Sequence, residues 1–171
     1  MLVAEGLGAR TRRGWVFQDV DLTVEDGAFE TLTGPAGSGR TSLLLALAGF
    51  FTISAGTVRR DGPAALAYVA GVNEPEPGLS VAEHFQERLV LLGRRRRLAR
   101  RYLDDVPLEP RKLGRDLDLL EAHLLCLHLA LLNEPAIVFA DDVDKGLSTE
   151  EQRTLADALT ETGKTVVVTS R

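Results

Sequence analysis

Apolar and polar side chains alternate near the start of the chain, which is the pattern of β-strands with one buried face. The apolar residues 2–4 are predicted to form a strand, and the alternation predicts a second strand over 16–24, followed by a turn at Asp26-Gly27. A shorter strand is expected over 29–33. It runs into a glycine-rich loop at 34–39.

Helical patterns begin after that loop. A helix rich in leucine and alanine is expected from Arg40 to Ala48, with Gly49 ending it. Two short strands are predicted next, over 57–59 and 65–69. Residues 70–80 carry glycines and prolines and are expected to form a hinge loop.

The middle of the chain contains only helical patterns. Ser80 and Glu83 form a capping box at the start of a helix that reaches about residue 92. An arginine-rich helix is expected over 94–103. Residues 117–132 are apolar almost all round, which predicts a buried helix.

Strands return in the last part of the chain. Residues 136–140 form a continuous apolar run, typical of the centre of a parallel sheet. A helix over 149–162, capped by Ser148, and a buried strand over 165–169 follow. Alternating strands and helices predict an α/β fold with a mostly parallel central sheet.

Composition limits the function classes. The chain has 171 residues, 26% of them charged, and a net charge of −5, so no nucleic acid is expected as a partner. Cys126 is the only cysteine, which excludes an internal disulfide. No signal peptide or membrane-spanning run is visible, and a cytoplasmic location is expected, with any membrane link made through a partner.

The glycine-rich loop indicates phosphate binding. Residues 34–41 read G-P-A-G-S-G-R-T and match G-x-x-x-x-G-K-[ST] except at Arg40, with a strand before and a helix after. Backbone N–H groups at such a helix start converge on phosphate. The predicted nucleotide-binding residues are Gly34, Pro35, Ala36, Gly37, Ser38, Gly39, Arg40, Thr41 and Ser42.

Arginine at the lysine position changes that loop. Arg40 keeps the positive charge, but its planar guanidinium is bulkier than an ammonium and does not fit the same cradle. Weakened, repositioned or diphosphate-like binding is therefore expected. Thr41 would place its hydroxyl on Mg²⁺.

The apolar strand over 136–140 ends in two carboxylates, Asp141 and Asp142. In a protein with a phosphate-binding loop, the first acid, Asp141, is expected to bind Mg²⁺ through water. Asp142 is the second acid of the pair. The predicted metal is thus Mg²⁺.

The order of these segments resembles the ATP-binding-cassette (ABC) ATPase family. The similar segments include the opening hairpin at 16–27, the loop and its helix, L-S-V-A-E at 79–83 and L-L-N-E-P before the acid strand. The resemblance implies a P-loop NTPase fold with an N-terminal antiparallel β hairpin and an inserted all-helical subdomain. We expect one domain over 1–171, with a core of 1–77 and 133–171 and a helical subdomain of 78–132.

Departures from the family pattern concern catalysis. The signature LSGGQ falls at L-D-L-L-E, residues 117–121, where Asp118 would bring a negative charge toward the phosphate of a partner's ATP. The catalytic glutamate falls at Asp142, one methylene shorter. The switch histidine falls at Ser170, which cannot carry a charge. The hinge-loop glutamine falls near Gly71 or Asn73.

The arginine cluster and the histidines give weaker indications of function. The arginine cluster at 94–101 contains no aromatic residue, and a solvated helix face with local ion pairs is expected, with a membrane subunit as the next candidate. His123 and His128 lie five residues apart on one helix and do not share a face.

Three functions remain open at this point. The first is an ATP-binding subunit of an ABC-type transport system with weak or partner-dependent hydrolysis, which would pair with a membrane subunit or with a second ATP-binding subunit. The second is a non-hydrolysing pseudo-ATPase that acts as a scaffold or regulator. The third is another P-loop enzyme, such as a small-molecule kinase, but the order of the segments favours the ABC family.

Overall fold

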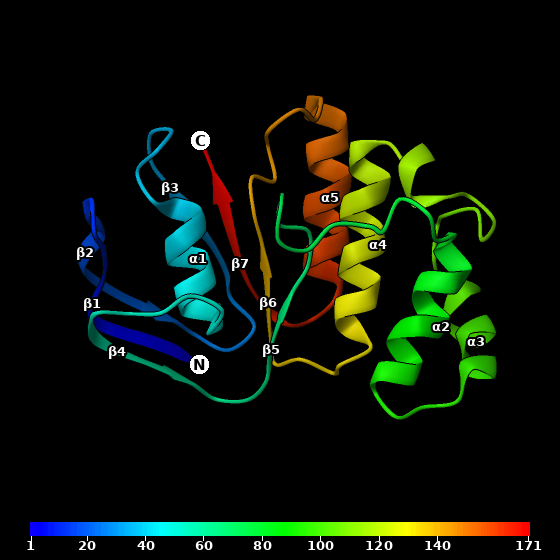
Figure 1. Ribbon diagram of the computed structural model, residues 1–171, viewed down its shortest axis with the longest axis horizontal. Helices are drawn as coiled ribbons and strands as arrows, with labels where there is room; N and C mark the ends of the chain where they lie inside the picture. Colours follow the sequence, from blue (N-terminus) through cyan, green and yellow to red (C-terminus); the bar gives the residue numbers. More distant parts are fainter.

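The computed structural model describes residues 1–171 and contains two β-sheets (Figure 1). The first sheet is antiparallel, with strand order β2-β1-β4. Its strands are β1 (Leu2–Thr11), β2 (Gly14–Val24) and β4 (Ala55–Arg60). Leu2 pairs with Val24 on one side and with Arg60 on the other. The alternation of the sequence therefore buries one face of this sheet, as predicted.

The second sheet is parallel, with strand order β3-β7-β6-β5. Its strands are β3 (Phe29–Thr33), β7 (Thr165–Ser170), β6 (Ile137–Ala140) and β5 (Ala64–Leu66). All four residues of β6 are buried, as its apolar sequence predicts. β3 is an edge strand and pairs only with β7, so its other edge offers unpaired backbone groups.

Helix α1 (Arg40–Ala48) lies between the two sheets (Figure 1). Its residues Leu44 to Ala48 are buried in a cluster with residues of β1, β6 and β7. Gly49 ends the helix in the left-handed conformation, with a φ of 88°, which glycine adopts without strain. At its other end, the start of α1 lies beside the ends of β6 and β7, where Thr41 contacts Asp141 and Arg40 contacts Ser170.

The remaining long helices cover the other face of the parallel sheet and extend beyond it (Figure 1). α4 (Leu119–Leu131) and α5 (Thr149–Glu161) pack on β6 and β7 in a second cluster. A third cluster joins α4 to α2 (Val81–Leu91) and α3 (Ala99–Leu103). α4 thus belongs to both groups, and the division of the chain at 78 and 132 stays a prediction.

The arginine-rich segment differs from its prediction. Instead of one helix over 94–103, the chain forms a 3₁₀ turn at Arg96–Leu98 followed by α3. Gly93 adopts a φ of 69°, which ends α2 and turns the chain. Another 3₁₀ turn at Gly114–Asp116 precedes α4. β1 is also longer than the strand predicted over 2–4.

The structure contains no helix that is both long enough and apolar enough to cross a bilayer.

Candidate functional site

The loop between β3 and α1 needs glycine at two positions. Gly37 and Gly39 have φ angles of 79° and 85°, which L side chains rarely adopt. A Cβ atom at Gly39 would also lie 2.5 Å from the carbonyl oxygen of Val16. The backbone therefore turns tightly enough to bring the start of α1 against the loop.

Backbone donors point into this loop at the start of α1. Leu43 N–H donates to Gly39 O at 2.8 Å, but the N–H groups of Arg40, Thr41 and Ser42 donate to no loop carbonyl. Free donors at a helix N-terminus favour an anion, because the helix dipole adds to their partial positive charge. The arrangement can hold phosphate.

Asp141 lies behind the loop and is 3% exposed. Its Oδ2 accepts from Thr41 Oγ1 at 2.8 Å, and its Oδ1 accepts from Thr169 Oγ1 at 2.5 Å. Two hydroxyl donors compensate a buried carboxylate for much of its lost hydration. The structure therefore brings together the two residues predicted to hold Mg²⁺, 100 positions apart in the sequence.

The chemistry of this pair fits Mg²⁺, which prefers hydroxyl and carboxylate oxygens and usually keeps several waters. Thr41 Oγ1 and Asp141 Oδ2 are adjacent oxygens on two different elements, α1 and the end of β6. A cation bound there would replace the hydroxyl proton as the partner of the carboxylate.

Asp142 follows in a left-handed conformation, with a φ of 46°. Its N–H donates to Thr169 Oγ1 at 2.7 Å, which anchors the turn. Its Oδ1 lies 3.7 Å from Arg40 Nη2, and its Oδ2 lies 3.2 Å from Lys145 Nζ. Each oxygen of the predicted catalytic base is thus paired with a cation of the protein.

Arg40 is turned toward the protein. Its Nη1 donates to the carbonyl oxygen of Ser170, and its side chain is only 11% exposed. Its Cδ lies 3.6 Å from the place where Gly34 would carry a Cβ, so the stem lies across the loop. The switch position Ser170 therefore takes part in the site through its backbone.

A cavity of 400 Å³ lies at this loop. Six of the nine predicted loop residues line it, together with Asp142, while Asp141 lies just beneath the surface. Three lining residues were missed by sequence reasoning: Val16, Lys145 and Arg171. The charge of Lys145, three residues after the second acid, was the available signal for one of them.

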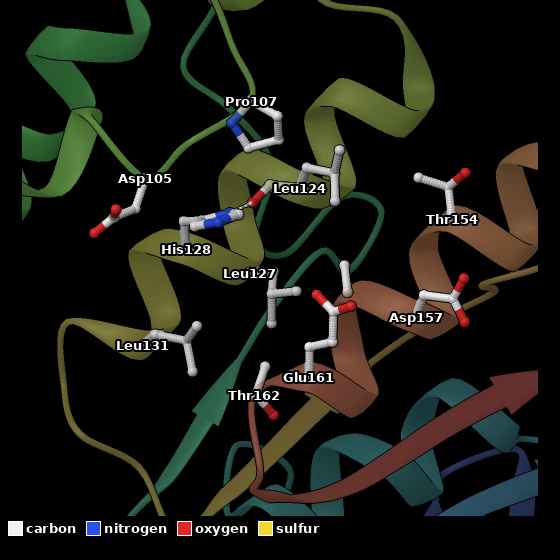
Figure 2. Close-up of a pocket in the computed structure, with 11 residues that line it drawn as sticks. Asp105, Pro107, Leu124, Leu127, His128, Leu131, Thr154, Asp157, Glu161 and Thr162 are labelled. Atoms are coloured by element: carbon white, nitrogen blue, oxygen red, sulfur yellow. Dashed lines mark hydrogen bonds between the residues drawn. The ribbon is translucent and has the colours of Figure 1, made fainter.

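A larger cavity of 530 Å³ lies elsewhere, between α4, α5 and the segment around Pro107 (Figure 2). Leucines form much of its wall, and Asp105, Asp157 and Glu161 surround it. His128 lines it and bonds Leu124 O of its own helix at 2.8 Å. Three carboxylates would repel phosphate, so this cavity is not the nucleotide site despite its size.

The segment at the signature position serves another purpose. Asp118 is the N-cap of α4 and accepts from Glu121 N–H at 2.8 Å, while Glu121 accepts from Asp118 N–H at 2.9 Å. Leu119 and Leu120 pack against the second core cluster. This segment is therefore built as a helix start with two apolar side chains.

The hinge loop also uses its polar residue internally. Asn73 Nδ2 donates to Leu66 O at 3.2 Å and to Ala67 O at 2.6 Å, which ties the loop to the end of β5. Cys126 Sγ lies 3.7 Å from Asn73 O, and burial raises the pKa of this thiol to about 12. The amide is therefore committed to the backbone of its own loop.

The arginine cluster forms local contacts. Arg94 lies 2.9 Å from Glu134, and Arg96 donates to Gln86 at 2.9 Å. The ion pair of Arg94 is therefore made with a residue 40 positions away in the sequence and not within the arginine-rich segment. Trp15, on β2, is 47% exposed, with the Arg10 guanidinium 5.7 Å from its ring centre.

A parallel sheet, a glycine loop leading into a helix, and a threonine–aspartate pair between that helix and the end of β6 define a P-loop NTPase fold. Residues 17–145 match the ABC transporter family. The chain belongs to this family.

Individual relatives of the chain are also ATP-binding proteins of import systems. The chain is 29% identical over 175 aligned residues to the zinc import ATP-binding protein ZnuC of Jannaschia sp. (strain CCS1), covering 99% of this chain and 72% of that protein. The taurine import ATP-binding protein TauB of Yersinia pestis bv. Antiqua (strain Antiqua) is 39% identical over 79 residues, which cover 43% of this chain and 31% of that protein.

Solved structures share the fold. The dimeric post-hydrolysis state of the ATP-binding cassette MJ0796 bound to ADP and Pi superposes with a TM-score of 0.81 at 21% identity, covering 100% of this chain and 88% of that one. The fold class predicted from the sequence is thereby confirmed.

Proposed function

We propose that this chain is an ATP-binding subunit of an ABC-type transport system and that it binds Mg-ATP at the loop over residues 34–42. The observation that carries the proposal is the Thr41–Asp141 hydrogen bond of 2.8 Å beside the free N–H groups of the α1 start. Thr41 and the donors for phosphate thus line one cavity, and Asp141, the second oxygen ligand for a divalent cation, lies directly beneath it.

Each predicted residue has a role in this proposal. Backbone groups of Gly34, Pro35, Ala36, Gly37, Ser38, Gly39, Arg40, Thr41 and Ser42 enclose the phosphates, with glycine at the positions of positive φ. Thr41 and Asp141 hold Mg²⁺, which when bound would neutralise phosphate charge. Arg40 contributes a positive charge that is shared with Asp142.

Hydrolysis by this site is proposed to be weak. Asp142 is the carboxylate closest in sequence to Asp141 and would have to accept a proton from water. A well-placed base contributes about 10²–10⁴-fold to a rate. Both oxygens of Asp142 are paired with cations, and its side chain is one methylene shorter than glutamate, so little of that factor is available.

The partners follow from the relatives. ZnuC and TauB are named as import ATP-binding proteins, so a transporter membrane subunit is the proposed partner, with a location peripheral to the membrane on the cytoplasmic side. A second ATP-binding subunit, which supplies an intact signature segment, would complete the site in a heterodimer.

One observation favours a second candidate function, a non-hydrolysing scaffold or regulator. The Arg40 guanidinium already has partners within the protein, because it contacts the carbonyl oxygen of Ser170 and the carboxylate of Asp142. A loop stabilised in this way could keep its fold without nucleotide.

Calorimetric titration of the whole chain with Mg-ATP and Mg-ADP separates the two candidates. Micromolar binding of Mg-ATP, with slow phosphate release in a separate assay, is the expected result. The matched variants are Thr41→Ala, which should lose the benefit of added Mg²⁺, and Thr41→Ser, which should keep it because the hydroxyl remains. Absence of binding at millimolar Mg-ATP would contradict the proposal and favour the scaffold.

A further inference from the structure

The cavity at the phosphate-binding loop is lined by three cationic side chains, those of Arg40, Lys145 and Arg171, and by one carboxylate, that of Asp142. Arg40 and Lys145 approach this carboxylate through different oxygens, at 3.7 Å and 3.2 Å. Arg40 and Lys145 differ in how firmly the protein holds them, and this difference decides which of these two side chains is available to a ligand.

Arg40 is committed to the protein. Its stem lies across Gly34, one guanidinium nitrogen donates to Ser170 O, and the other faces Asp142. These contacts leave the side chain 11% exposed. Turning it toward a phosphate would leave the Ser170 carbonyl without its partner and Asp142 with Lys145 alone, so Arg40 serves mainly to hold α1 against the ends of β6 and β7.

The backbone of Lys145 is held by hydrogen bonds, whereas the end of its side chain is exposed. Its N–H donates to Asp142 O at 3.1 Å, and Gln152 Nε2 holds the same turn through Asp144 O at 3.2 Å and Leu147 O at 2.9 Å. The side chain, by contrast, is 54% exposed and has one partner, the Asp142 carboxylate. An exposed ion pair three residues apart is weak, and a lysine ammonium on its flexible stem can exchange it for another anion.

The position of Lys145 determines which phosphate group of a bound nucleotide its ammonium would contact. The free N–H groups lie at the α1 start, on one side of the cavity, whereas Lys145 follows the acids at the end of β6. A phosphate chain anchored at the helix start and extending toward β6 would present its last group to Lys145, and this group carries the most negative charge.

We infer that Lys145 is the cation that contacts the terminal phosphate of a nucleoside triphosphate at this site, a role that Arg40 within the loop does not fill. The inference rests on the proposed function. In the absence of nucleotide, the Lys145 ammonium pairs with the Asp142 carboxylate instead of with the terminal phosphate. The site then distinguishes triphosphate from diphosphate through a residue outside the glycine loop.

The test compares the affinities of Mg-ATP and Mg-ADP in calorimetric titrations of the whole chain and three variants. Lys145→Met removes the charge at similar length, and Lys145→Arg retains it. The matched control is Lys164→Met, because Lys164 lies just before the start of β7, at the opposite end of the strand from the site. We expect Lys145→Met to weaken Mg-ATP binding about tenfold, as for one charge-assisted contact, with less than a roughly twofold change for Mg-ADP.

Lys145→Arg and Lys164→Met should bind both nucleotides like the wild type. An equal loss for both nucleotides, or no loss, in Lys145→Met would overturn the assignment of Lys145 while leaving the proposed function standing. Failure of the wild type to bind either nucleotide would instead overturn the proposed function, and the role of Lys145 with it.

Discussion

His123 is a single buried residue whose charge state couples pH to stability. It is 2% exposed, its ring centre lies 4.3 Å from that of Tyr68, and its Nδ1 has no hydrogen-bond partner. Burial lowers the pKa of His123 to about 4, and the negative charge of Asp142 opposes this only in part. The folded protein therefore holds this histidine neutral where the unfolded chain would protonate it.

The sign of the pH effect follows from that difference. The pKa of His123 is lower in the folded protein than in the unfolded chain. The free energy of unfolding is therefore undiminished by this residue above an unfolded pKa of about 6.5, and it decreases as the pH falls toward about 4. Between about pH 7 and pH 5 we expect His123 to contribute a loss of about 2 kcal/mol in the free energy of unfolding.

Urea unfolding at both pH values measures that loss. His123→Gln should show a smaller drop between the two pH values than the wild type, even if its stability is lower at both. His128→Gln, a half-buried site on the same helix, should retain the full drop. Equal drops in the wild type and His123→Gln would contradict the assignment.

The residues of the site were predictable to different degrees. The loop sequence and the acids Asp141 and Asp142 were read directly, because both lie in local motifs beside a strand or helix. The Arg40–Asp142 pair and the hydroxyl of Thr169 were not predicted. Thr169 meets Asp141 because β7 lies beside β6 in the sheet, and Arg40 meets Asp142 because α1 starts beside the end of β6; both pairs join residues that are far apart in the sequence.

Among the elements, α4 depends on its N-cap residue, Asp118. Asp118 and Glu121 close a capping box at its start, and Lys112 Nζ lies 2.5 Å from Glu121 Oε2. Because α4 contributes to two core clusters, fraying of its first turn would loosen both. Asp118→Ala should therefore lower the free energy of unfolding by about 1 kcal/mol, the typical cost of losing an N-cap.

Serine at the same position provides the control. Asp118→Ser keeps a side-chain acceptor for the Glu121 N–H and should unfold within a few tenths of a kcal/mol of the wild type. Chemical denaturation of the three proteins makes the comparison. If alanine and serine behave alike, the capping contact is not what stabilises the start of α4.

The elements with a strong local signal were predicted well. The bounds of α1 and β3 match their predictions, and the capping box at Ser80 is present, because glycines and caps define these boundaries locally. The segment over 94–103 was misjudged, because arginine favours helix by itself. There the turn at Gly93 and the contact of Arg94 with Glu134 decide the local path of the chain.

At the scale of the whole molecule, the features expected for ATP binding are retained at the glycine loop but altered at the start of α4. In the proposed function the loop holds phosphate and Thr41 with Asp141 holds Mg²⁺, whereas the start of α4 presents the carboxylate of Asp118 and two packed leucines. A pair of copies of this chain, arranged as the family resemblance implies, would place Asp118 of each toward the phosphates bound by the other.

We therefore expect this chain alone to remain monomeric when Mg-ATP is added. Sedimentation velocity with and without nucleotide, over a range of protein concentrations, checks this expectation. A dimer that forms only with Mg-ATP would show that the α4 start accepts a partner's phosphate despite its charge. A dimer that forms equally without nucleotide would point to a different interface.

The unpaired edge of β3 affects how the protein behaves at high concentration. Phe29 is 40% exposed on this five-residue strand, and no proline or lysine interrupts it. Free backbone groups beside an exposed aromatic residue are a template on which another extended chain can assemble, and a net charge of −5 opposes such assembly only weakly at high salt. Solubility should therefore depend on salt and concentration through this strand, and a single lysine at Thr31 is the substitution best placed to protect it.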